Sequence, residues 1–459
     1  MSRSAYIHIP FCRRRCYYCD FAVSVVGDRP PMAQQSASVD RQSFGTIAHY
    51  IKVLCEEIRI TEPVGGSLET VFFGGGTPSL LAVEQLIQIL TALDQQFGIA
   101  ADAEISMEID PGTFDLAQVQ GYRAAGVNRV SVGVQAFQPE LLQACGRSHT
   151  VADVYAAVEW VQQAGLTNFS LDLISGLPHQ TLAHWQESLE MAIALAPTHL
   201  SCYDLTIEPM TAFSRQYKPG VQPLPSDDTT AAMYRTAQHV LTAAGYNHYE
   251  ISNYARPGYQ CRHNRVYWEN RPFYGFGMGA TSYLAHDRLS RPRKTREYYA
   301  WVDAQQQEYG ESKISSQRSN VSAPEKGSAP IKPNSNLKLT PEEPLRAQTA
   351  QLEPLSSPLP TASLNTDRLL DTLMLGLRLA EGLSLATLIE QFGQTTWARV
   401  WECLQPFQAK GWLVITSDRN AAIDPSSAPL PKSGRLQLTD PEGFLFSNVI
   451  LVSLFEAFE

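Results

Sequence analysis

Cysteine is scarce in this sequence of 459 residues, which contains only eight. A disulfide-rich scaffold needs many more, so that class is excluded. No window reaches the roughly 18 continuous apolar residues of a membrane span, and the N-terminus has no charged start followed by an apolar run. With 36 Lys and Arg against 46 Asp and Glu, the chain has no general attraction for nucleic acid or anionic lipid. The sequence therefore predicts a cytoplasmic protein that has no transmembrane segment and does not bind nucleic acid.

The first half of the chain alternates short apolar runs with longer amphipathic stretches, a pattern typical of repeated strand-then-helix units. Strands are predicted over residues 5–9, 70–73, 104–109, 129–134, 168–174 and 199–205. Helices are predicted over residues 48–61, 80–97, 116–125, 151–164 and 182–195. Six strands in this order predict an α/β fold with a parallel sheet. The sheet is either open and doubly wound or a partial TIM-like barrel, and periodicity does not choose between them.

The remaining segments suggest how the chain divides into domains. Residues 1–300 form the predicted main domain, with a loop insertion at residues 22–45. Residues 310–366 are rich in Ser, Pro and Lys and contain no aromatic residue, so we expect a disordered low-complexity insertion there. Residues 367–459 are predicted to form a small helical, winged-helix-like domain. Its predicted elements are helices over residues 369–380, 385–392 and 397–411 and a strand over residues 412–416.

Three cysteines follow the first predicted strand in a C-x3-C-x2-C spacing, as Cys12, Cys16 and Cys19. Thiolates are the soft ligands that iron–sulfur clusters prefer, and three of them on a four-iron cluster leave one iron open to another ligand. The spacing therefore indicates a [4Fe-4S] site. A zinc site with His8 as the fourth ligand, or three unligated thiols, are the alternatives.

The cysteine triplet, together with Gly74-Gly75-Gly76-Thr77-Pro78 after the second strand, resembles the radical S-adenosylmethionine (SAM) superfamily. The resemblance implies a partial TIM-like barrel in which the open iron binds the amino and carboxylate groups of SAM. Reductive cleavage of SAM can yield a 5′-deoxyadenosyl radical in this superfamily. It also implies that Tyr18 flanks the adenine. The glycines would allow backbone N–H groups to approach the methionyl part of SAM.

Polar residues at the ends of later strands extend this site, because barrel enzymes bind ligands at the carboxyl ends of their strands. Arg147 could pair its planar guanidinium with the SAM carboxylate. The set is similar to the SAM-contacting residues of oxygen-independent coproporphyrinogen III dehydrogenases. The residues that this resemblance implies are Tyr6, Gly75, Gly76, Thr77, Glu108, Gln135, Arg147 and Asp172.

Two features depart from those dehydrogenases. Their fourth cysteine, two residues after the third, is replaced here by Phe21. Residues 263–268 read H-N-x-x-Y-W, a motif that resembles the HemW heme chaperone family. Imidazole is a good axial ligand of heme iron, so the resemblance implies His263 as a heme ligand. Tyr267 and Trp268 could line the flat macrocycle. Cys261 is predicted to pack, with ligation of the heme iron or covalent attachment of heme as the alternatives.

A basic cluster lies further along the chain. Its residues are Arg288, Arg291, Arg293, Lys294 and Arg296. These side chains could meet heme propionates, but a solvated face is the interpretation that we favour. The aromatic and glycine-rich stretch before it, residues 273–279, is predicted to be a loop.

Two functions follow from these resemblances. The first is a heme chaperone that binds heme, a [4Fe-4S] cluster and SAM and delivers heme to an unidentified acceptor protein. The second is an oxygen-independent coproporphyrinogen III dehydrogenase, which forms protoporphyrinogen IX by radical decarboxylation. The motif and the missing fourth cysteine favour the chaperone. Whether SAM is cleaved, and whether the acceptor is membrane-associated, stays open.

Overall fold

The computed structural model describes residues 2–27, 46–319, 361–417, 421–423 and 430–458. Most of the two predicted insertions, residues 22–45 and 310–366, lies outside these residues. The described ends of the second insertion are helical, because α10 (Thr295–Ser319) passes its predicted start and α11 (Thr361–Gly376) begins before its predicted end. The first insertion begins with the short strand β3 (Ser24–Val25), which pairs with β2 (Phe11–Cys12).

Six parallel strands form the centre of the main sheet and confirm the predicted α/β fold. They are β1 (Ser4–Ile9), β4 (Leu68–Gly75), β5 (Ile99–Ile109), β6 (Arg129–Gln135), β7 (Phe169–Ser175) and β8 (His199–Asp204). They lie side by side in chain order, and each pairs with the next in parallel. A doubly wound sheet reverses its strand order at a switch point, so this order identifies a partial barrel.

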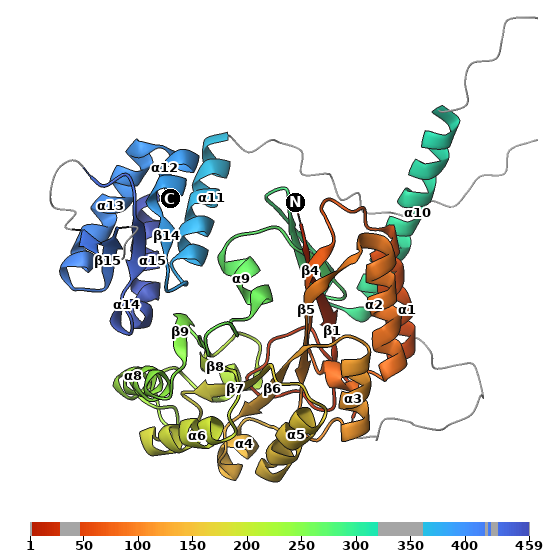
Figure 1. Cartoon of the computed structure of the whole chain (residues 1–459), viewed down its shortest axis with the longest axis horizontal. Helices are drawn as coiled ribbons and strands as arrows, with labels where there is room; N and C mark the ends of the chain where they lie inside the picture. Colours follow the sequence, from red (N-terminus) through yellow and green to blue (C-terminus); the bar gives the residue numbers. More distant parts are fainter. Residues whose placement is uncertain (1, 28–45, 320–360, 418–420, 424–429, 459) are drawn as a thin grey trace, which may run out of the picture.

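Helices follow the strands and cover the outer face of the sheet (Figure 1). The long ones are α1 (Ile47–Ile60), α2 (Val83–Phe97), α3 (Leu116–Ala124), α5 (Val151–Gln163), α6 (Leu182–Ala194) and α8 (Asp227–Ala243). Shorter turns of helix lie at Pro78–Leu80, α4 (Pro139–Ala144) and α7 (Ala212–Gln216). Thr150 and Thr181 begin α5 and α6 by accepting a hydrogen bond from the backbone N–H three residues on, which satisfies a free helix donor.

The sheet is longer than the sequence predicts. Residues 273–279 contain the strand β11 (Tyr274–Phe276), which pairs in parallel with β1, so the predicted loop there is wrong. At the opposite edge, β10 (Asn253–Ala255) and β9 (Asn247–Glu250) add to β8 in antiparallel order. A hairpin of β12 (Thr281–Leu284) and β13 (Asp287–Ser290) follows β11.

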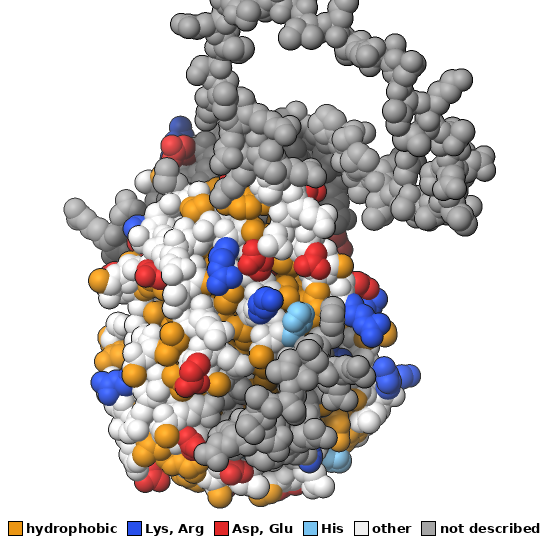
Figure 2. Space-filling view, turned by 90° about the vertical axis from the view of Figure 1, so that its right-hand side faces the viewer, with side chains coloured by type: hydrophobic (Ala, Val, Ile, Leu, Met, Phe, Trp, Pro, Cys, Tyr) orange, Lys and Arg blue, Asp and Glu red, His pale blue; other side chains and the backbone are white. Residues whose placement is uncertain are grey.

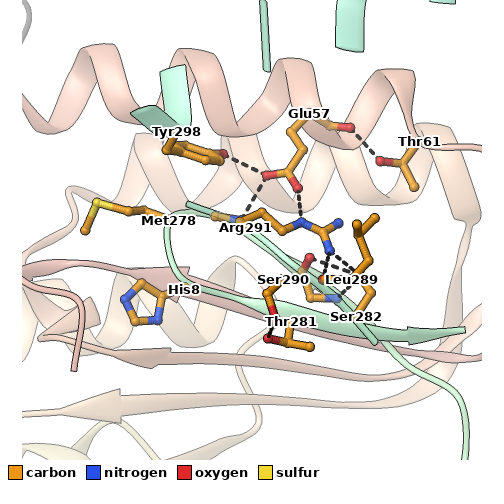
Figure 3. Close-up of polar contacts among 12 residues, drawn as sticks. His8, Glu57, Thr61, Met278, Thr281, Ser282, Leu289, Ser290, Arg291 and Tyr298 are labelled. Carbon is orange, nitrogen blue, oxygen red and sulfur yellow. Dashed lines mark hydrogen bonds and ion pairs between the residues drawn. The ribbon is translucent and has the colours of Figure 1, made fainter. Parts of the chain in front are cut away.

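A buried ion pair fastens the β11 to α10 segment to the barrel. Glu57 of α1 and Arg291 are within 2.8 Å and almost completely buried. Glu57 also accepts hydrogen bonds from the Tyr298 hydroxyl (2.7 Å) and the Gly277 N–H (2.9 Å). Figure 3 shows Arg291 reaching Glu57 on one side and Ser282 and Leu289 on the other. The buried charge of Arg291 is thus compensated by Glu57 and by hydrogen bonds, as burial of a charge requires.

The C-terminal residues form a second unit with its own core. Its helices are α11, α12 (Leu385–Phe392), α13 (Gln394–Ala409), α14 (Glu442–Leu445) and α15 (Ser447–Phe458). They pack on an antiparallel sheet of β14 (Leu383–Ser384), β17 (Arg435–Leu438), β15 (Leu413–Thr416) and β16 (Ala422–Ile423). Trp397, Leu404 and Ile450 are fully buried in this core, away from the core of the barrel. The predicted helices and strand of this region are confirmed.

Charged side chains are spread thinly over the face of the molecule seen in Figure 2. On the face seen in Figure 2, Lys and Arg side chains stand singly and do not merge into a broad patch. Among the described residues, no helix combines the length and the apolar character that crossing a membrane requires.

Candidate functional site

A cavity of about 460 Å³ opens at the carboxyl ends of the parallel strands. This volume lies within the range of small-molecule sites. Its wall combines the cysteine loop with the residues that end successive strands of the barrel. Of the predicted site residues, those that line it are Cys12, Cys16, Tyr18, Cys19, Gly75, Gly76, Thr77, Glu108, Gln135, Arg147 and Asp172. Tyr6 and His263 are not among its lining residues.

The three cysteines lie close together in the chain after β1, with Cys12 at the end of β2 and Cys16 and Cys19 in the loop that follows. Their thiols are free and partly exposed, and burial raises the pKa of Cys12 to about 12 and also raises that of Cys19. Arg147 Nη1 lies 3.4 Å from Cys16 Sγ, which places one cation beside the sulfur group. In contrast, both ring nitrogens of His8 are engaged, by Tyr6 and by the Ala22 carbonyl. His8 is therefore not free to act as a fourth zinc ligand.

The glycine turn at the end of β4 is packed closely against neighbouring parts of the chain. Gly75 has a φ of +103°, and a Cβ there would lie 2.3 Å from the His8 ring. The N–H groups of Gly75, Gly76 and Thr77 donate to Glu108, Ile9 and Phe11. These N–H groups are therefore not open toward a ligand. The glycines instead allow β4 to pack closely against β1 and the cysteine loop.

Two carboxylates, Glu108 and Asp172, face the cavity from β5 and β7. Burial and the nearby charge of Asp172 raise the pKa of Glu108 to about 8. Asp172 accepts hydrogen bonds at 2.8 Å from the Ser131 hydroxyl, and its pKa is also raised by burial. The pair can therefore take up a cationic group, because a positive charge between them would offset the cost of ionising both.

The side chain of Arg147 is buried and lines the cavity. It pairs with Asp110 and donates to the Gly133 carbonyl at 2.9 Å. The sequence analysis assigns the guanidinium of Arg147 to the SAM carboxylate, but here its Nη2 is already paired with Asp110. Nearby, Gln135 has a φ of +70° at an irregularity in the β6–β7 pairing. Such bulges redirect side chains next to functional sites.

Several residues complete the cavity that the sequence analysis did not select. Asp110 follows Glu108 by two positions on the same strand end, and Tyr203 and Asp204 end β8. Burial raises the pKa of Asp204 to about 6. The rule that selected Glu108, a polar residue at the carboxyl end of a parallel strand, would have found them.

Comparisons with known proteins agree with this geometry. The radical SAM superfamily model matches residues 6–192, and the HemN C-terminal domain model matches residues 364–421. The heme chaperone HemW of Synechocystis sp. is 44% identical over 459 residues, which cover 100% of this chain and 98% of that protein. The chain belongs to the HemW family.

Other HemW relatives are more distant. The protein of Escherichia coli is 40% identical over 295 residues, covering 64% of this chain and 74% of the relative. The solved structure of coproporphyrinogen III oxidase (HemN) from Escherichia coli is similar with a TM-score of 0.69 at 22% identity, covering 98% of this chain and 89% of that one. This likeness shows the shared fold.

The radical SAM fold of the HemW family implies a [4Fe-4S] cluster and SAM, and the cavity fits both. Soft sulfur donors form one wall, and carboxylates and polar groups form the other. Arg147 Nε is buried at this site and has no hydrogen-bond partner among the residues that the structure describes. In the described part of the chain, no three His, Cys, Asp or Glu side chains surround a single metal ion.

The histidine of the H-N-x-x-Y-W motif lies inside the protein. His263, on α9 (Arg262–Trp268), is fully buried, and its ring stacks on Phe72 with centres 5.2 Å apart. Its Nδ1 is 2.8 Å from the Thr70 hydroxyl and its Nε2 is 2.8 Å from the Tyr267 hydroxyl. Burial lowers its pKa to about 3. Both nitrogens are occupied, so heme coordination by His263 stays a prediction that requires one of these two hydrogen bonds to break.

Other residues around the motif have structural partners. Cys261 is fully buried and accepts the Asn264 N–H at the start of α9, as packing alone would predict. The basic cluster is not one solvated face. Arg291 is buried on Glu57, and Arg293 donates to the Asp20 carbonyl beside the cysteine loop at 2.6 Å. Only part of the cluster, such as Lys294, is open to solvent.

Proposed function

We propose that this protein binds heme and delivers it to an acceptor protein. The observation that carries the proposal is the 44% identity along the whole chain to a protein named as a heme chaperone. The H-N-x-x-Y-W motif and the absence of a fourth cysteine at Phe21 support it. We also propose a cytoplasmic location and a division into residues 1–300, 310–366 and 367–459.

We propose that Cys12, Cys16 and Cys19 hold the cluster. The other side chains of the cavity would then surround SAM, with Glu108 and Asp172 placed to meet its cationic groups and Tyr18 placed to flank its adenine. Tyr6 lies outside the lining of the cavity, so it would support the SAM site indirectly. Its hydroxyl forms a hydrogen bond with His8, and its ring stacks with Phe72. When bound, the reduced cluster can supply one electron to SAM. This chain contributes the side chains that would bind the cluster and SAM, and a buried, polar environment around them.

The rival function is oxygen-independent coproporphyrinogen III dehydrogenation. The similarity to the HemN structure is one of fold at 22% identity. This chain has Phe21 at the position where the resemblance to the dehydrogenase family implies a fourth cysteine. We therefore favour delivery of heme over its synthesis.

Anaerobic reconstitution of the full-length chain followed by two titrations tests the proposal. Addition of ferric heme should give a saturable absorption change near one equivalent, whereas coproporphyrinogen III with SAM and a reductant should yield no protoporphyrinogen IX. Cys12→Ser should lose iron and visible absorbance, and the matched variant Cys403→Ser, on α13, should keep both. Protoporphyrinogen formation, or no response to heme, would overturn the proposal.

A further inference from the structure

A second cavity lies between the barrel and the C-terminal domain. It has a volume of about 360 Å³ and is separate from the cysteine loop. One wall is α9 and the tip of the β12–β13 hairpin, and the other is α11, β14 and α12. Figure 1 shows α9 on the side of the barrel that faces α11 and β14. We call this cavity the interdomain cleft. Its volume lies within the range of small-molecule sites, and clefts between domains are frequent ligand sites.

Aromatic and aliphatic side chains form part of the lining of the interdomain cleft, and polar side chains form the rest. Trp268, the last residue of the H-N-x-x-Y-W motif, and Tyr283 of the hairpin line it from the barrel. Leu383 and Leu388 line it from the C-terminal domain. The motif thus has two ends with different surroundings. His263 is buried in the barrel, whereas Trp268 reaches the cleft.

One imidazole at the cleft has a nitrogen available. His286 forms the tip of the β12–β13 hairpin, where a two-residue turn of Ala285 and His286 gives both residues a positive φ. The side chain is exposed, and its Nδ1 is 3.5 Å from the Tyr283 hydroxyl. Its Nε2 makes no hydrogen bond to any residue that the structure describes. An imidazole held through one nitrogen with the other open is the arrangement of a metal-ligating histidine.

The charges of the interdomain cleft favour an anionic ligand. Three arginines line it against two glutamates. Arg265 pairs with Glu269 and Glu381, which accounts for both carboxylates. Within the described part of the chain, Arg435 donates only to backbone carbonyls, and the side chain of Arg368 has no hydrogen bond or ion pair. Two guanidinium groups therefore lack a carboxylate partner, and carboxylates are the ligands that their geometry suits.

We propose that the interdomain cleft is the heme site, with His286 as an axial ligand. The macrocycle would lie against Trp268 and Tyr283, and its propionates would meet Arg368 and Arg435. This inference rests on the proposed function, because it names the place where this protein holds heme. It also separates the heme from the cavity of the cysteine loop, so that both sites can be filled at once.

Titration of the full-length, cluster-reconstituted chain with ferric heme tests the location. The variant is His286→Asn, because asparagine tolerates the left-handed backbone of the turn and so preserves the hairpin. We expect its heme dissociation constant to rise at least tenfold and its Soret band and electron paramagnetic resonance signal to lose the histidine-ligated form. His239→Asn, at an exposed position of α8, should match the unchanged protein.

Two further measurements separate ring docking from iron ligation. Metal-free protoporphyrin IX keeps the propionates but has no iron, so its affinity should not change in His286→Asn. Its affinity should fall several-fold in Arg368→Gln and stay unchanged in Arg399→Gln, an exposed position of α13. An unchanged heme spectrum in His286→Asn would overturn the proposal. So would loss of the histidine-ligated signal in a folded His263→Ala variant with His286 intact. If the unchanged protein binds no heme, the proposed function fails instead.

Discussion

At the scale of single residues, the cavity of the cysteine loop contains acidic groups whose pKa is raised by burial. Glu108 is the clearest case, because Asp172 and Asp110 add to the effect of burial and only the Gly75 N–H opposes it. Placing two or more carboxylates in one small site makes sense when a cation enters it. The same grouping should make the stability of the cofactor-free protein depend on pH.

Glu108 should make the cofactor-free protein less stable as pH rises. Its pKa is about 8 in the folded chain against an ordinary value of 4.5, so the folded state binds this proton more tightly than the unfolded state. The stabilising contribution is complete below about pH 4.5 and is lost as pH rises to about 8. At about 1.4 kcal/mol for each pKa unit, the free energy of unfolding should fall by a few kcal/mol across this window. Urea unfolding at a series of pH values measures the fall.

The matched variants for this measurement are Glu108→Gln and Glu190→Gln. Glutamine keeps an acceptor for the Gly75 N–H but cannot ionise, so Glu108→Gln should flatten the pH profile. Glu190 is exposed on α6, and its replacement should leave the slope unchanged. Equal slopes in Glu108→Gln and the unchanged protein would contradict the expectation.

The kinds of residue in the site are readable from the sequence, but their pairings are not. The spacing of Cys12, Cys16 and Cys19 predicts a shared loop, because the three lie within eight positions of one another. The pairing of Arg147 with Asp110 joins residues 37 positions apart, and the burial of His263 against Thr70 joins residues 193 apart. Such contacts depend on how whole elements pack, which local pattern does not encode.

At the scale of elements, the segment from β11 to α10 braces the barrel beside the cysteine loop. It pairs with β1, reaches α1 through Arg291 and holds the far end of the loop through Arg293. The sequence does not reveal this brace, because β11 is only three residues long, contains Gly275 and is followed directly by Gly277. Its partner strand is about 270 residues earlier in the chain. The longer strands and helices are predictable, because their periodicity and caps are local.

Arg291→Met tests the brace. The substitution removes the counter-charge of Glu57, which is 1% exposed, so we expect a loss of about 3–5 kcal/mol in the free energy of unfolding. The double variant Glu57→Gln with Arg291→Met leaves no buried charge and should recover part of that loss. Lys294→Ala removes an exposed pair and should leave the urea midpoint unchanged. A double variant no more stable than Arg291→Met would argue against the ion pair as the cause.

At the scale of the whole molecule, the C-terminal domain is joined to the edge of the barrel sheet. Glu250 of β9 forms an antiparallel bridge with Leu379, and the Ala380 N–H donates to the Tyr249 carbonyl at 2.9 Å. Exposed contacts, such as the pair of Arg235 and Glu442, lie around this junction. The junction fixes the width of the interdomain cleft, since the walls of the cleft belong to both domains.

Arg378 links the junction to the interdomain cleft. It lies 3.3 Å from the fully buried carboxylate of Glu250, and its guanidinium stacks over Trp268 at 4.3 Å. Arg378→Met would leave Glu250 without its counter-charge, so the free energy of unfolding should fall by about 3 kcal/mol. Because the lost contact joins two separate cores, unfolding should also become less cooperative.

Two probes followed in the same urea titration detect this separation. Cluster absorbance reports on the barrel, and tryptophan fluorescence includes Trp397 and Trp401 in the core of the C-terminal domain. In Arg378→Met, the fluorescence change should precede the loss of cluster absorbance, whereas Arg235→Gln should shift both together by less than about 1 kcal/mol. Coincident transitions in Arg378→Met would mean that the backbone bridge at Glu250 and Leu379 couples the two domains without the help of the arginine.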